Sequence, residues 1–406
     1  MRDGPTSRFP GWRVVAACFI CLMTTSGLGF YGLAVYLTVL SRERGWSVGS
    51  ISAAGAVFFL VGGLAGVIVA RQIARRDVRV VIVVGAVVGA VALVMLGRIS
   101  QVWHVYLAYI VLSIGHAFSG LVPATTVVTR WFHTRRSVAL AVASTGLSAG
   151  GIVVTPLVKF FLDRNGLAAT APWLAVVWLI GIVPITLLFI RPDPASLGWQ
   201  PDGLKASSAT RQPMFSTGRS DAIRSRFFLL VTIAYTFIFA AQIGAIQQLV
   251  KLVEERHGMS IATLSTTVLA GSSVLARLAG GHLASQLSMA KLAVGCAALQ
   301  GCSLILLAFV ESLASMMIGI VLFGATIGNL LMLHPLLIGQ EFGSENYAQI
   351  FSRSQLFVFI GAAAGPFLVG VIHDATGGYL AAYLLAGGFS LAGAAILPRF
   401  VRRDIA

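Results

Sequence analysis

Charged residues are scarce in this sequence, and acidic residues are the scarcest of them. Only 14 Asp and Glu stand beside 29 Lys and Arg, and the four types together make up 11% of the chain. Hydrophobic residues reach 57%, and the mean hydropathy is +0.89. A soluble globular domain carries roughly 25% charged residues. The composition therefore excludes that class and predicts an integral membrane protein.

The residue clusters of enzymes and metal sites are also missing. The four cysteines are interpreted as small packing residues, because they lie in apolar stretches without metal ligands at useful spacing. They are Cys18, Cys21, Cys296 and Cys302. We find no nucleophile, acid–base pair or metal cluster that would gather at one depth of a membrane. We therefore expect no enzyme activity, no cofactor and no metal.

Long apolar runs are abundant instead. A helix that crosses a membrane needs roughly 20 mostly apolar residues, and these runs show little of the alternation typical of barrel strands. Twelve transmembrane helices are predicted, at residues 12–40, 48–70, 78–98, 102–131, 136–162, 168–190, 225–252, 260–286, 289–309, 312–340, 346–372 and 377–398. The predicted fold class is an all-α membrane protein.

Basic residues gather in alternate joints between these runs. The joints after the second and fourth runs and the C-terminal tail contain Arg71, Arg75, Arg76, Arg79, Arg130, Arg135, Arg136, Arg399, Arg402 and Arg403. Because Lys and Arg near span ends favour the cytoplasm, these joints and both termini are predicted to be cytoplasmic. The net charge of +15 then reflects topology and attraction to anionic membrane lipids. Basic residues so dispersed do not indicate nucleic-acid binding.

The longest polar interruption divides the chain into two halves. Residues 191–224 are rich in Pro, Gly, Ser and charge, and six predicted helices lie on either side. We expect an N-terminal half at 1–190, a cytoplasmic central loop at 191–224 and a C-terminal half at 225–406. Related segments begin at Gly66, "GVIVARQIARR", and at Gly281, "GHLASQLSMAK", which are 281 − 66 = 215 residues apart. This offset of half the chain is typical of a transporter with parallel repeats.

These two segments resemble the loop signature of the major facilitator superfamily. In that signature a Gly is followed four residues later by Asp-Arg and then by further basic residues. Here Ala70 and Ser285 stand where the Asp is expected, Arg71 is retained and Arg75 follows it. The resemblance implies the fold of that superfamily, two pseudo-symmetric six-helix halves. It also implies that the loop latches the cytoplasmic side between conformations, a role that the missing acids put in doubt.

Further stretches resemble the bacterial monocarboxylate and oxalate branch of this superfamily. They are "GWRVVAACF" from Gly11, "RWFHTRRSVALAVASTGLSAGGIVVTPL" from Arg130, "RPDPASLGWQPDG" from Arg191 and "FGSENYAQIFSRSQLFVFIGAAAGPFLVGVIHDATGGY" from Phe342. The resemblance extends over the whole chain. It implies transport of small organic carboxylates across the inner membrane of a bacterium.

Arg277 is the residue that most needs an explanation, because it is the single charge in "LAGSSVLARLAGGHLASQL". An arginine at membrane depth is costly unless it faces a wet cavity or a partner. A guanidinium also suits a carboxylate, since two parallel charge-assisted hydrogen bonds fit its fork. In the branch that the chain resembles, an Arg of the eighth helix binds the substrate carboxylate. Animal relatives often carry an Asp one turn earlier, where this chain has Ser273. The alternative is an arginine that reaches the cytoplasmic surface or a carbonyl at a helix end.

Other polar side chains inside the predicted helices are candidates for the same site. Arg353 lies near a lysine that assists binding of a dianion in the oxalate branch, but a one-residue slip would turn it to another face. His116 and His334 are candidates for proton coupling because imidazole titrates near neutrality. The expected substrate-binding set is completed by Tyr31, Asn329 and Gln242. Static packing is the alternative for each of them.

The expected function is secondary active transport of a small organic carboxylate, a monocarboxylate first, by proton symport and alternating access. The absence of Asp and Glu from the middle of the spans counts against export of cationic drugs. Export of amphipathic drugs and exchange of one carboxylate for another stay open as alternatives. The expected partners are the organic anion, protons and membrane lipids, and the expected working unit is a monomer.

Overall fold

Every regular element that the structure describes is a helix. The computed structural model describes residues 9–46, 48–203 and 219–398. The helices are α1 (Gly11–Thr25), η1 (Ser26–Phe30), α2 (Gly32–Arg44), α3 (Val48–Ile73), α4 (Val78–Leu96), α5 (Val102–Ser119), α6 (Leu121–Trp131), α7 (Arg136–Ala149), η2 (Gly150–Val154), α8 (Thr155–Phe189), η3 (Ala195–Leu197), η4 (Pro201–Gly203), α9 (Arg219–Arg224), α10 (Arg226–His257), α11 (Met259–Gln286), α12 (Met289–Phe309), α13 (Leu313–Phe342), α14 (Tyr347–Thr376) and α15 (Tyr379–Ile396). Helices suit a chain in lipid because they satisfy every backbone polar group internally.

The helices account for the twelve predicted spans. Ten helical stretches in the described ranges are long and apolar enough to cross a membrane. One of them, Arg136–Phe189, is 54 residues long and contains the predicted fifth and sixth spans. These two meet at Gly166, whose φ of 76° breaks the helical path. The predicted eighth span is α11, a helix of 28 residues in which many Ser and Thr dilute the apolar residues.

Three predicted spans are less regular than expected. A π-helical turn, Ser26–Phe30, interrupts the first span, and a second, Gly150–Val154, interrupts the fifth. The fourth span is divided into α5 and α6 at Gly120, whose φ of −97° and ψ of −134° are not helical. Apolar periodicity does not reveal such breaks, because the side chains on either side of them remain apolar.

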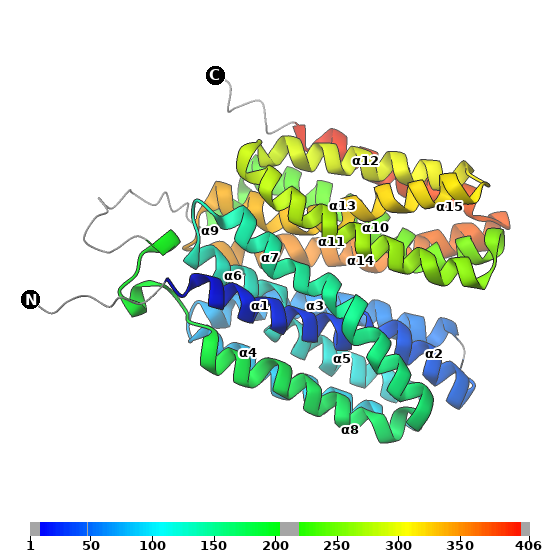
Figure 1. Cartoon of the computed structure of the whole chain (residues 1–406), viewed down its shortest axis with the longest axis horizontal. Helices are drawn as coiled ribbons and strands as arrows, with labels where there is room; N and C mark the ends of the chain where they lie inside the picture. The colour runs from blue at the N-terminus through cyan, green and yellow to red at the C-terminus, as the bar shows by residue number, and fades with distance from the viewer. Residues whose placement is uncertain (1–8, 47, 204–218, 399–406) are drawn as a thin grey trace, which may run out of the picture.

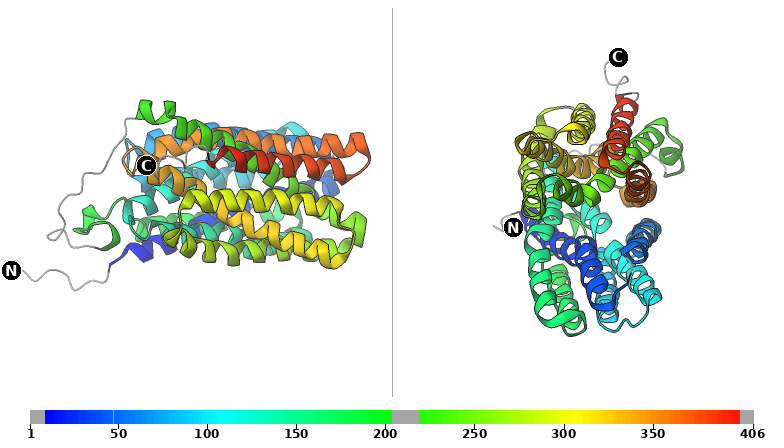
Figure 2. Two further views of the ribbon diagram at one scale, coloured as in Figure 1. Left: turned by 90° about the horizontal axis from the view of Figure 1, so that it is seen from above. Right: turned by 90° about the vertical axis from the view of Figure 1, so that its right-hand side faces the viewer.

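The helices form two bundles that lie side by side along their length (Figure 1). Helices α1 to α8 make one bundle and α10 to α15 the other, and the end-on view separates them clearly (Figure 2). The bundles meet where α3 lies against α14 and α7 against α11. Figure 1 places the start of α1 and the end of α15 toward the same end of the molecule. We call this the linker end, because the described parts of the central loop, residues 191–203 and 219–224, also lie there.

Glycines make the tightest contacts inside each bundle. A side chain at Gly146 would meet the carbonyl oxygen of Phe19 in α1, and one at Gly361 would meet the carbonyl oxygen of Thr236 in α10. The two glycines are 361 − 146 = 215 residues apart, the same offset as between Gly66 and Gly281. Small residues at a helix interface allow two backbones to approach closely. The equivalent contacts show that the two bundles repeat one packing scheme.

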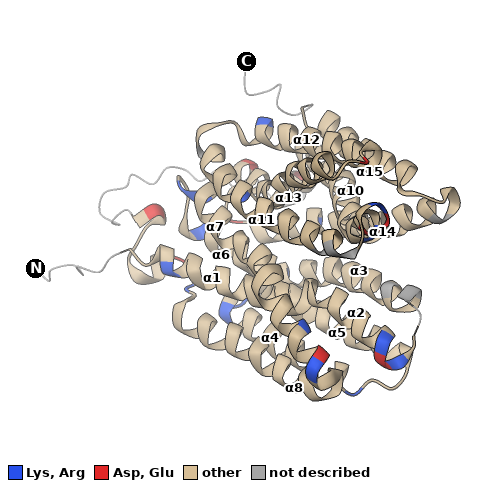
Figure 3. Ribbon diagram, turned by 45° about the vertical axis from the view of Figure 1, so that its right-hand side comes forward, with Lys and Arg blue, Asp and Glu red and all other residues tan. Residues whose placement is uncertain are grey.

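Charged residues concentrate at the two ends of the bundles, and few of them lie in the middle (Figure 3). Polar residues also start several helices. The Asp77 carboxylate accepts a hydrogen bond of 2.9 Å from the backbone N–H of Arg79 at the start of α4. The Ser225 hydroxyl accepts one of 3.1 Å from the N–H of Phe228 at the start of α10. Each cap satisfies a donor that the first turn leaves unpaired.

Candidate functional site

A small cavity lies between the two bundles, about midway along the helices, and both bundles contribute to its wall. Its volume is about 110 Å³. The polar side chains that line it are Ser26, Tyr31, His116, Ser148, Gln242, Arg277, His334 and Gln355, and the rest of the wall is mostly Phe, Leu and Ile. An enclosed apolar space with a few convergent polar groups is the usual form of a small-molecule site.

Arg277 of α11 is the cation of this cavity. Its side chain is only 1% exposed, so it does not reach the cytoplasmic surface. Its Nε donates a 3.0 Å hydrogen bond to the carbonyl oxygen of Gly328 in α13, and its Nη1 donates to that of Ser144 in α7. These carbonyls lie within helices of opposite bundles, not at helix ends. Among the described residues, no Asp or Glu forms an ion pair with Arg277.

Gly328 creates the space that Arg277 occupies. A Cβ atom at Gly328 would lie 2.8 Å from Arg277 Nε and 2.5 Å from the carbonyl oxygen of Ser273. Any larger residue would therefore displace the guanidinium or separate α13 from α11. The sequence did not single out Gly328 or Ser144, because backbone carbonyls have no residue-specific signature.

His116 and Tyr31 meet at the first π-helical turn. His116 Nδ1 lies 3.2 Å from the carbonyl oxygen of Thr25, the residue before this turn. As the carbonyl only accepts, Nδ1 carries the proton and Nε2 is left as an acceptor. The ring of Tyr31 packs against Gly151, where a Cβ atom would come within 2.9 Å of it. Short π-helical turns are frequent at functional sites, and here Ser26 and Phe30 of the first turn line the cavity.

His334 of α13 lies on the opposite wall. Its Nε2 is 2.8 Å from the hydroxyl oxygen of Ser354 in α14, and Thr232 of α10 donates a 2.9 Å hydrogen bond to the same hydroxyl oxygen. The imidazole stacks on the ring of Tyr235 with centroids 4.5 Å apart. Both histidines predicted from the sequence therefore line the cavity, one from each bundle.

Two glutamines present polar atoms to the cavity. The Oε1 atoms of Gln242 in α10 and Gln355 in α14 are buried, and neither has a hydrogen-bond partner within the described part of the chain. A buried acceptor without a partner costs about 1–3 kcal/mol, so both atoms are suited to a ligand. Gln242 was expected in the site. Gln355 was not among the expected substrate-binding residues, although it lies only two positions after Arg353 in the sequence.

Arg353 and Asn329 do not line the cavity, in contrast to expectation. Arg353 donates a 3.1 Å hydrogen bond to the carbonyl oxygen of Gln349 in its own helix. Residues 353 and 355 are separated by about 200° around a helix, so the face that brings Gln355 into the cavity turns Arg353 away. Asn329 donates to the carbonyl oxygen of Ala325 at 2.9 Å. Its amide fills the space beside Gly280 of α11, which makes it a helix-packing residue.

The segments with the loop signature lie at the linker end. Arg71 and Arg75 are exposed and form no ion pair with another described residue. The nearby Asp77 is bound by Arg79, with atoms 2.7 Å apart, and this hydrogen bond lowers the pKa of the Asp77 carboxyl. Gly281 lies against Ala141 of α7, so that the two bundles approach closely there.

A buried arginine joins the bundles at the same end. Arg136 begins α7 and is 8% exposed. Its Nη1 donates a 2.7 Å hydrogen bond to the carbonyl oxygen of Gly339 in α13, and its Nε donates to that of Phe132 at 3.1 Å. Contact between the bundles at this end therefore involves a guanidinium and a carbonyl instead of the acids of the loop signature.

Comparison with known proteins gives one consistent result. The family model of the Major Facilitator Superfamily matches residues 19–352. Human Monocarboxylate transporter 11 is 25% identical over 98% of this chain and 84% of its own length. Rat Monocarboxylate transporter 13 is 23% identical over 95% and 88%.

Solved structures share the fold. The E. coli fucose:proton symporter superposes with a TM-score of 0.70 at 17% identity and covers 95% of this chain and 97% of its own. The human organic anion transporter MFSD10 superposes with a TM-score of 0.72 at 15% identity, over 96% and 100%. With the family match across most of its length, this chain belongs to the Major Facilitator Superfamily, and it is a membrane transporter of small molecules and not an enzyme.

Proposed function

We propose that this protein is a secondary active transporter of small organic monocarboxylates. Arg277 carries the proposal, because it places a permanent positive charge in a cavity lined by both bundles. The guanidinium has five N–H donors, and the two backbone carbonyls engage Nε and Nη1 only. No described acid neutralises it. A carboxylate would supply both the missing charge and two acceptors in the matching geometry.

The size of the cavity supports a small substrate. Pockets for drug-sized ligands have volumes of roughly 300–1,000 Å³, whereas this cavity has about 110 Å³. A short-chain acid fits this space, and an amphipathic drug requires a much wider conformation. The names of the two monocarboxylate transporters among the relatives support the same substrate class. A monomer as the working unit is part of the proposal.

Arg277 also suggests how substrate binding is coupled to movement. Its bond to Ser144 joins α11 to α7 across the two bundles. A carboxylate is a stronger acceptor for a guanidinium than a neutral carbonyl. We expect the substrate to replace the Ser144 carbonyl while the bond to Gly328 stays in the C-terminal bundle. The substrate then weakens one contact between the bundles. A ligand changes the balance of two conformations only if it binds one of them better, and loss of this contact would favour the conformation in which the bundles are separated there.

Proton symport is the coupling that we propose, with His116 and His334 as the proton sites. The acceptor Nε2 of His116 is suited to receive a proton near the substrate. A second space of about 30 Å³ adjoins the cavity at His116 and Gln355 and extends to Gly66 near the linker end. This volume suffices for one water molecule, which would connect His116 toward that end. Exchange of carboxylates would use the same anion site.

The remaining expectations on topology are part of the proposal. We place an N-terminal half at 1–190, a cytoplasmic loop at 191–224 and a C-terminal half at 225–406, in the inner membrane of a bacterium with both termini in the cytoplasm. The concentration of arginines at the linker end supports this orientation. The repeated glycine contacts of the two bundles support the division into halves.

Uptake into proteoliposomes tests the proposed function. Purified protein is reconstituted, and uptake of labelled acetate, lactate, pyruvate, oxalate and benzoate is measured with an acid-outside pH gradient. We expect saturable uptake of at least one monocarboxylate, stimulation by the gradient and loss of stimulation with a protonophore. Arg277→Gln should abolish uptake, and Arg277→Lys should retain a weak activity because it keeps the charge but not the fork.

Arg164→Gln is the matched control, because Arg164 is an exposed arginine that lies over the ring of Phe160. Each variant is first shown to be monodisperse by size-exclusion chromatography. Uptake that requires internal carboxylate and ignores the pH gradient would identify an exchanger. Transport of dyes that Arg277→Gln leaves intact, without carboxylate uptake, would refute the proposal.

A further inference from the structure

A large hollow lies away from the central cavity, on the outer surface of the N-terminal bundle. It is a groove of about 740 Å³ between α4, α5 and α8. Its wall is almost entirely apolar, and the side chains of Val87, Val91, Leu107 and Val176 in it are 42–51% exposed. In a membrane protein such side chains face lipid, so the groove opens toward the bilayer and not toward the transport path.

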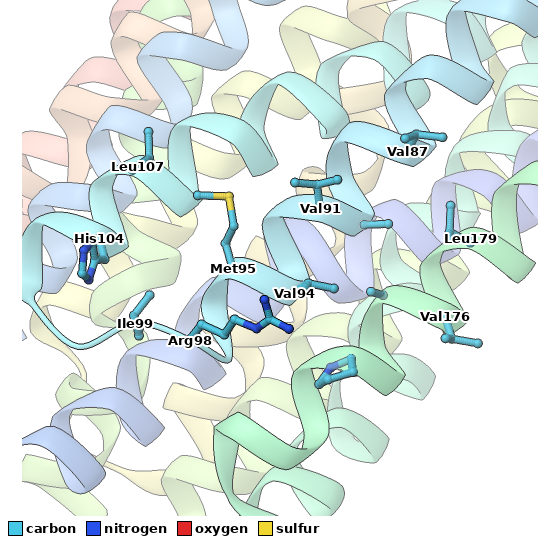
Figure 4. Close-up of a pocket in the computed structure, with 13 residues that line it drawn as sticks. Val87, Val91, Val94, Met95, Arg98, Ile99, His104, Leu107, Val176 and Leu179 are labelled. Atoms are coloured by element: carbon cyan, nitrogen blue, oxygen red, sulfur yellow. The ribbon is translucent and has the colours of Figure 1, made fainter.

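One end of the groove is polar. Arg98 and His104 lie at this end, whereas Val87 and Leu179 lie at the other (Figure 4). Arg98 is exposed and makes no ion pair with another described residue. His104 Nδ1 accepts hydrogen bonds of 3.2 Å from the backbone N–H groups of Ser100 and Gln101. The ring proton is therefore on Nε2, which remains a donor.

The polar end coincides with the expected level of the lipid headgroups. Trp103 and Trp173 are 57% and 70% exposed. They adjoin the lining residues His104 and Pro172 in the sequence. Tryptophan is enriched at the boundary between the hydrocarbon and the headgroups. Two exposed indoles beside an unpaired guanidinium thus mark the depth at which phosphate groups occur.

The length of the groove matches one leaflet of a bilayer. Val87 and Leu96, the last residue of α4, are nine positions apart, and a rise of about 1.5 Å per residue gives about 14 Å between them, with Arg98 two residues beyond. Half of a hydrocarbon core of roughly 30 Å is about 15 Å. The groove therefore extends from the headgroup level to the middle of the membrane, the depth that one acyl chain occupies.

We propose that this groove binds an anionic phospholipid of the leaflet opposite the linker end, with one acyl chain along α4 and the phosphate on Arg98 and the Nε2–H group of His104. The single unpaired cation selects a net negative headgroup, and the apolar wall accepts the chain. The occupant is a lipid and not a second copy of this protein. The length of the groove matches an acyl chain of one leaflet, and its one cation matches an anionic headgroup. Binding here does not depend on the identity of the transported substrate.

Native mass spectrometry of the purified protein tests this site. The protein is incubated with phosphatidylglycerol or phosphatidylcholine of identical acyl chains, and the retained lipid is counted. We expect about tenfold greater retention of phosphatidylglycerol. Arg98→Gln should reduce it to the level of phosphatidylcholine. Val91→Trp fills the groove from an exposed position and should reduce retention of both lipids.

Arg164→Gln is the control for loss of an exposed arginine, and it should leave retention unchanged. Equal retention of the two lipids by the wild-type protein would overturn the proposal. The proposal would also be overturned if Arg98→Gln and Arg164→Gln reduced retention of phosphatidylglycerol equally. That result would show that any surface arginine attracts the lipid, without a specific site. If Val91→Trp retains phosphatidylglycerol like the wild type, the lipid binds elsewhere and the groove is not its site.

Discussion

Arg277 holds one backbone carbonyl in each bundle, and its position depends on the absence of a side chain at Gly328. An alanine there would bring a Cβ atom within 2.8 Å of Nε, so the guanidinium must move. Overpacking of this kind costs about 1–3 kcal/mol, and about 1.4 kcal/mol corresponds to tenfold in affinity. We expect Gly328→Ala to raise the KM for the proposed carboxylate substrate about tenfold, as measured by the concentration dependence of uptake.

Gly271→Ala is the control, because Gly271 lies in α11 and a Cβ atom there meets nothing within 4 Å. It should leave KM unchanged. If Gly328→Ala also leaves KM unchanged, the guanidinium is not held in its binding position by the space at Gly328.

The unpaired amides of Gln242 and Gln355 give a second prediction at the residue scale. Gln242→Leu removes a buried acceptor that has no partner among the described residues, so the free protein should be at least as stable as the wild type. The same change should weaken binding of acids that carry a hydroxyl group. The hydroxyl group of the acid would then lack its hydrogen-bond partner, at a cost of about 1–3 kcal/mol. Such an acid should compete roughly tenfold more weakly with the labelled substrate.

Competition of hydroxylated and unsubstituted acids of equal length against the labelled substrate checks this prediction, with Gln355→Leu as a parallel variant. Gln247→Leu is the control, since Gln247 is exposed on α10. Equal loss for both kinds of acid would show that the amide shapes the cavity without recognising a hydroxyl.

Some of the residues that line the candidate cavity were named from the sequence. Arg277, His116 and His334 were found because a polar residue in an apolar run is conspicuous and expensive. Arg353 was favoured over Gln355 because a charge is more conspicuous than an amide. Which of the two faces the cavity depends on the rotation of α14, and the helical pattern does not determine that angle. Gly328 matters because it leaves room for the guanidinium, and Ser144 because its backbone carbonyl accepts a hydrogen bond. Neither property can be recognised from the residue type.

Helix packing repeats between the bundles at the scale of the elements. Gly146 lies against Phe19 and Gly361 against Thr236, in each case with the carbonyl oxygen of the facing helix. We expect Gly146→Ala and Gly361→Ala to lower stability by similar amounts, on the order of 1–3 kcal/mol, since each inserts a methyl group between two backbones. Thermal unfolding followed by tryptophan fluorescence in detergent measures the effect.

Gly388→Ala in α15 is the matched control, because a Cβ atom there meets nothing within 4 Å. Alanine is favoured over glycine in a helix by about 1 kcal/mol, so this variant should unfold at the same or a higher temperature. A shift of Gly361→Ala alone, with Gly146→Ala like the control, would contradict equivalent packing in the two bundles.

The elements themselves were largely predictable. Hydropathy locates the spans because about 20 apolar residues are needed wherever a helix crosses the bilayer. The break at Gly120 and the π-helical turns at Ser26–Phe30 and Gly150–Val154 were not predicted. The two π-helical turns lie against each other, although 119 residues, 31–149, separate them in the sequence. The apolar pattern of one helix does not predict a contact with a segment that is distant in the sequence.

The whole molecule moves only if contacts between the bundles at the linker end can be broken and formed again. The sequence left the latch at this end in doubt, since Ala70 and Ser285 stand where the family signature has acids. The bond from Arg136 to Gly339 provides a contact of another kind, from a charged donor to a carbonyl. Hydrogen bonds to charged groups contribute about 1.5–3 kcal/mol, enough to change the balance of two conformations tenfold or more.

We therefore expect Arg136→Ala to shift the protein toward conformations that are open at the linker end. Spin labels on cysteines introduced at the exposed positions Ala74 and Gln340, in a Cys302→Ser background, would report the separation of the bundles. The longer-distance population should grow about tenfold. Arg135→Ala is the adjacent control, because the Arg135 side chain is exposed. If both variants give the wild-type distance distribution, the closed state does not depend on Arg136, and the close approach of Gly281 to Ala141 must hold the bundles together instead.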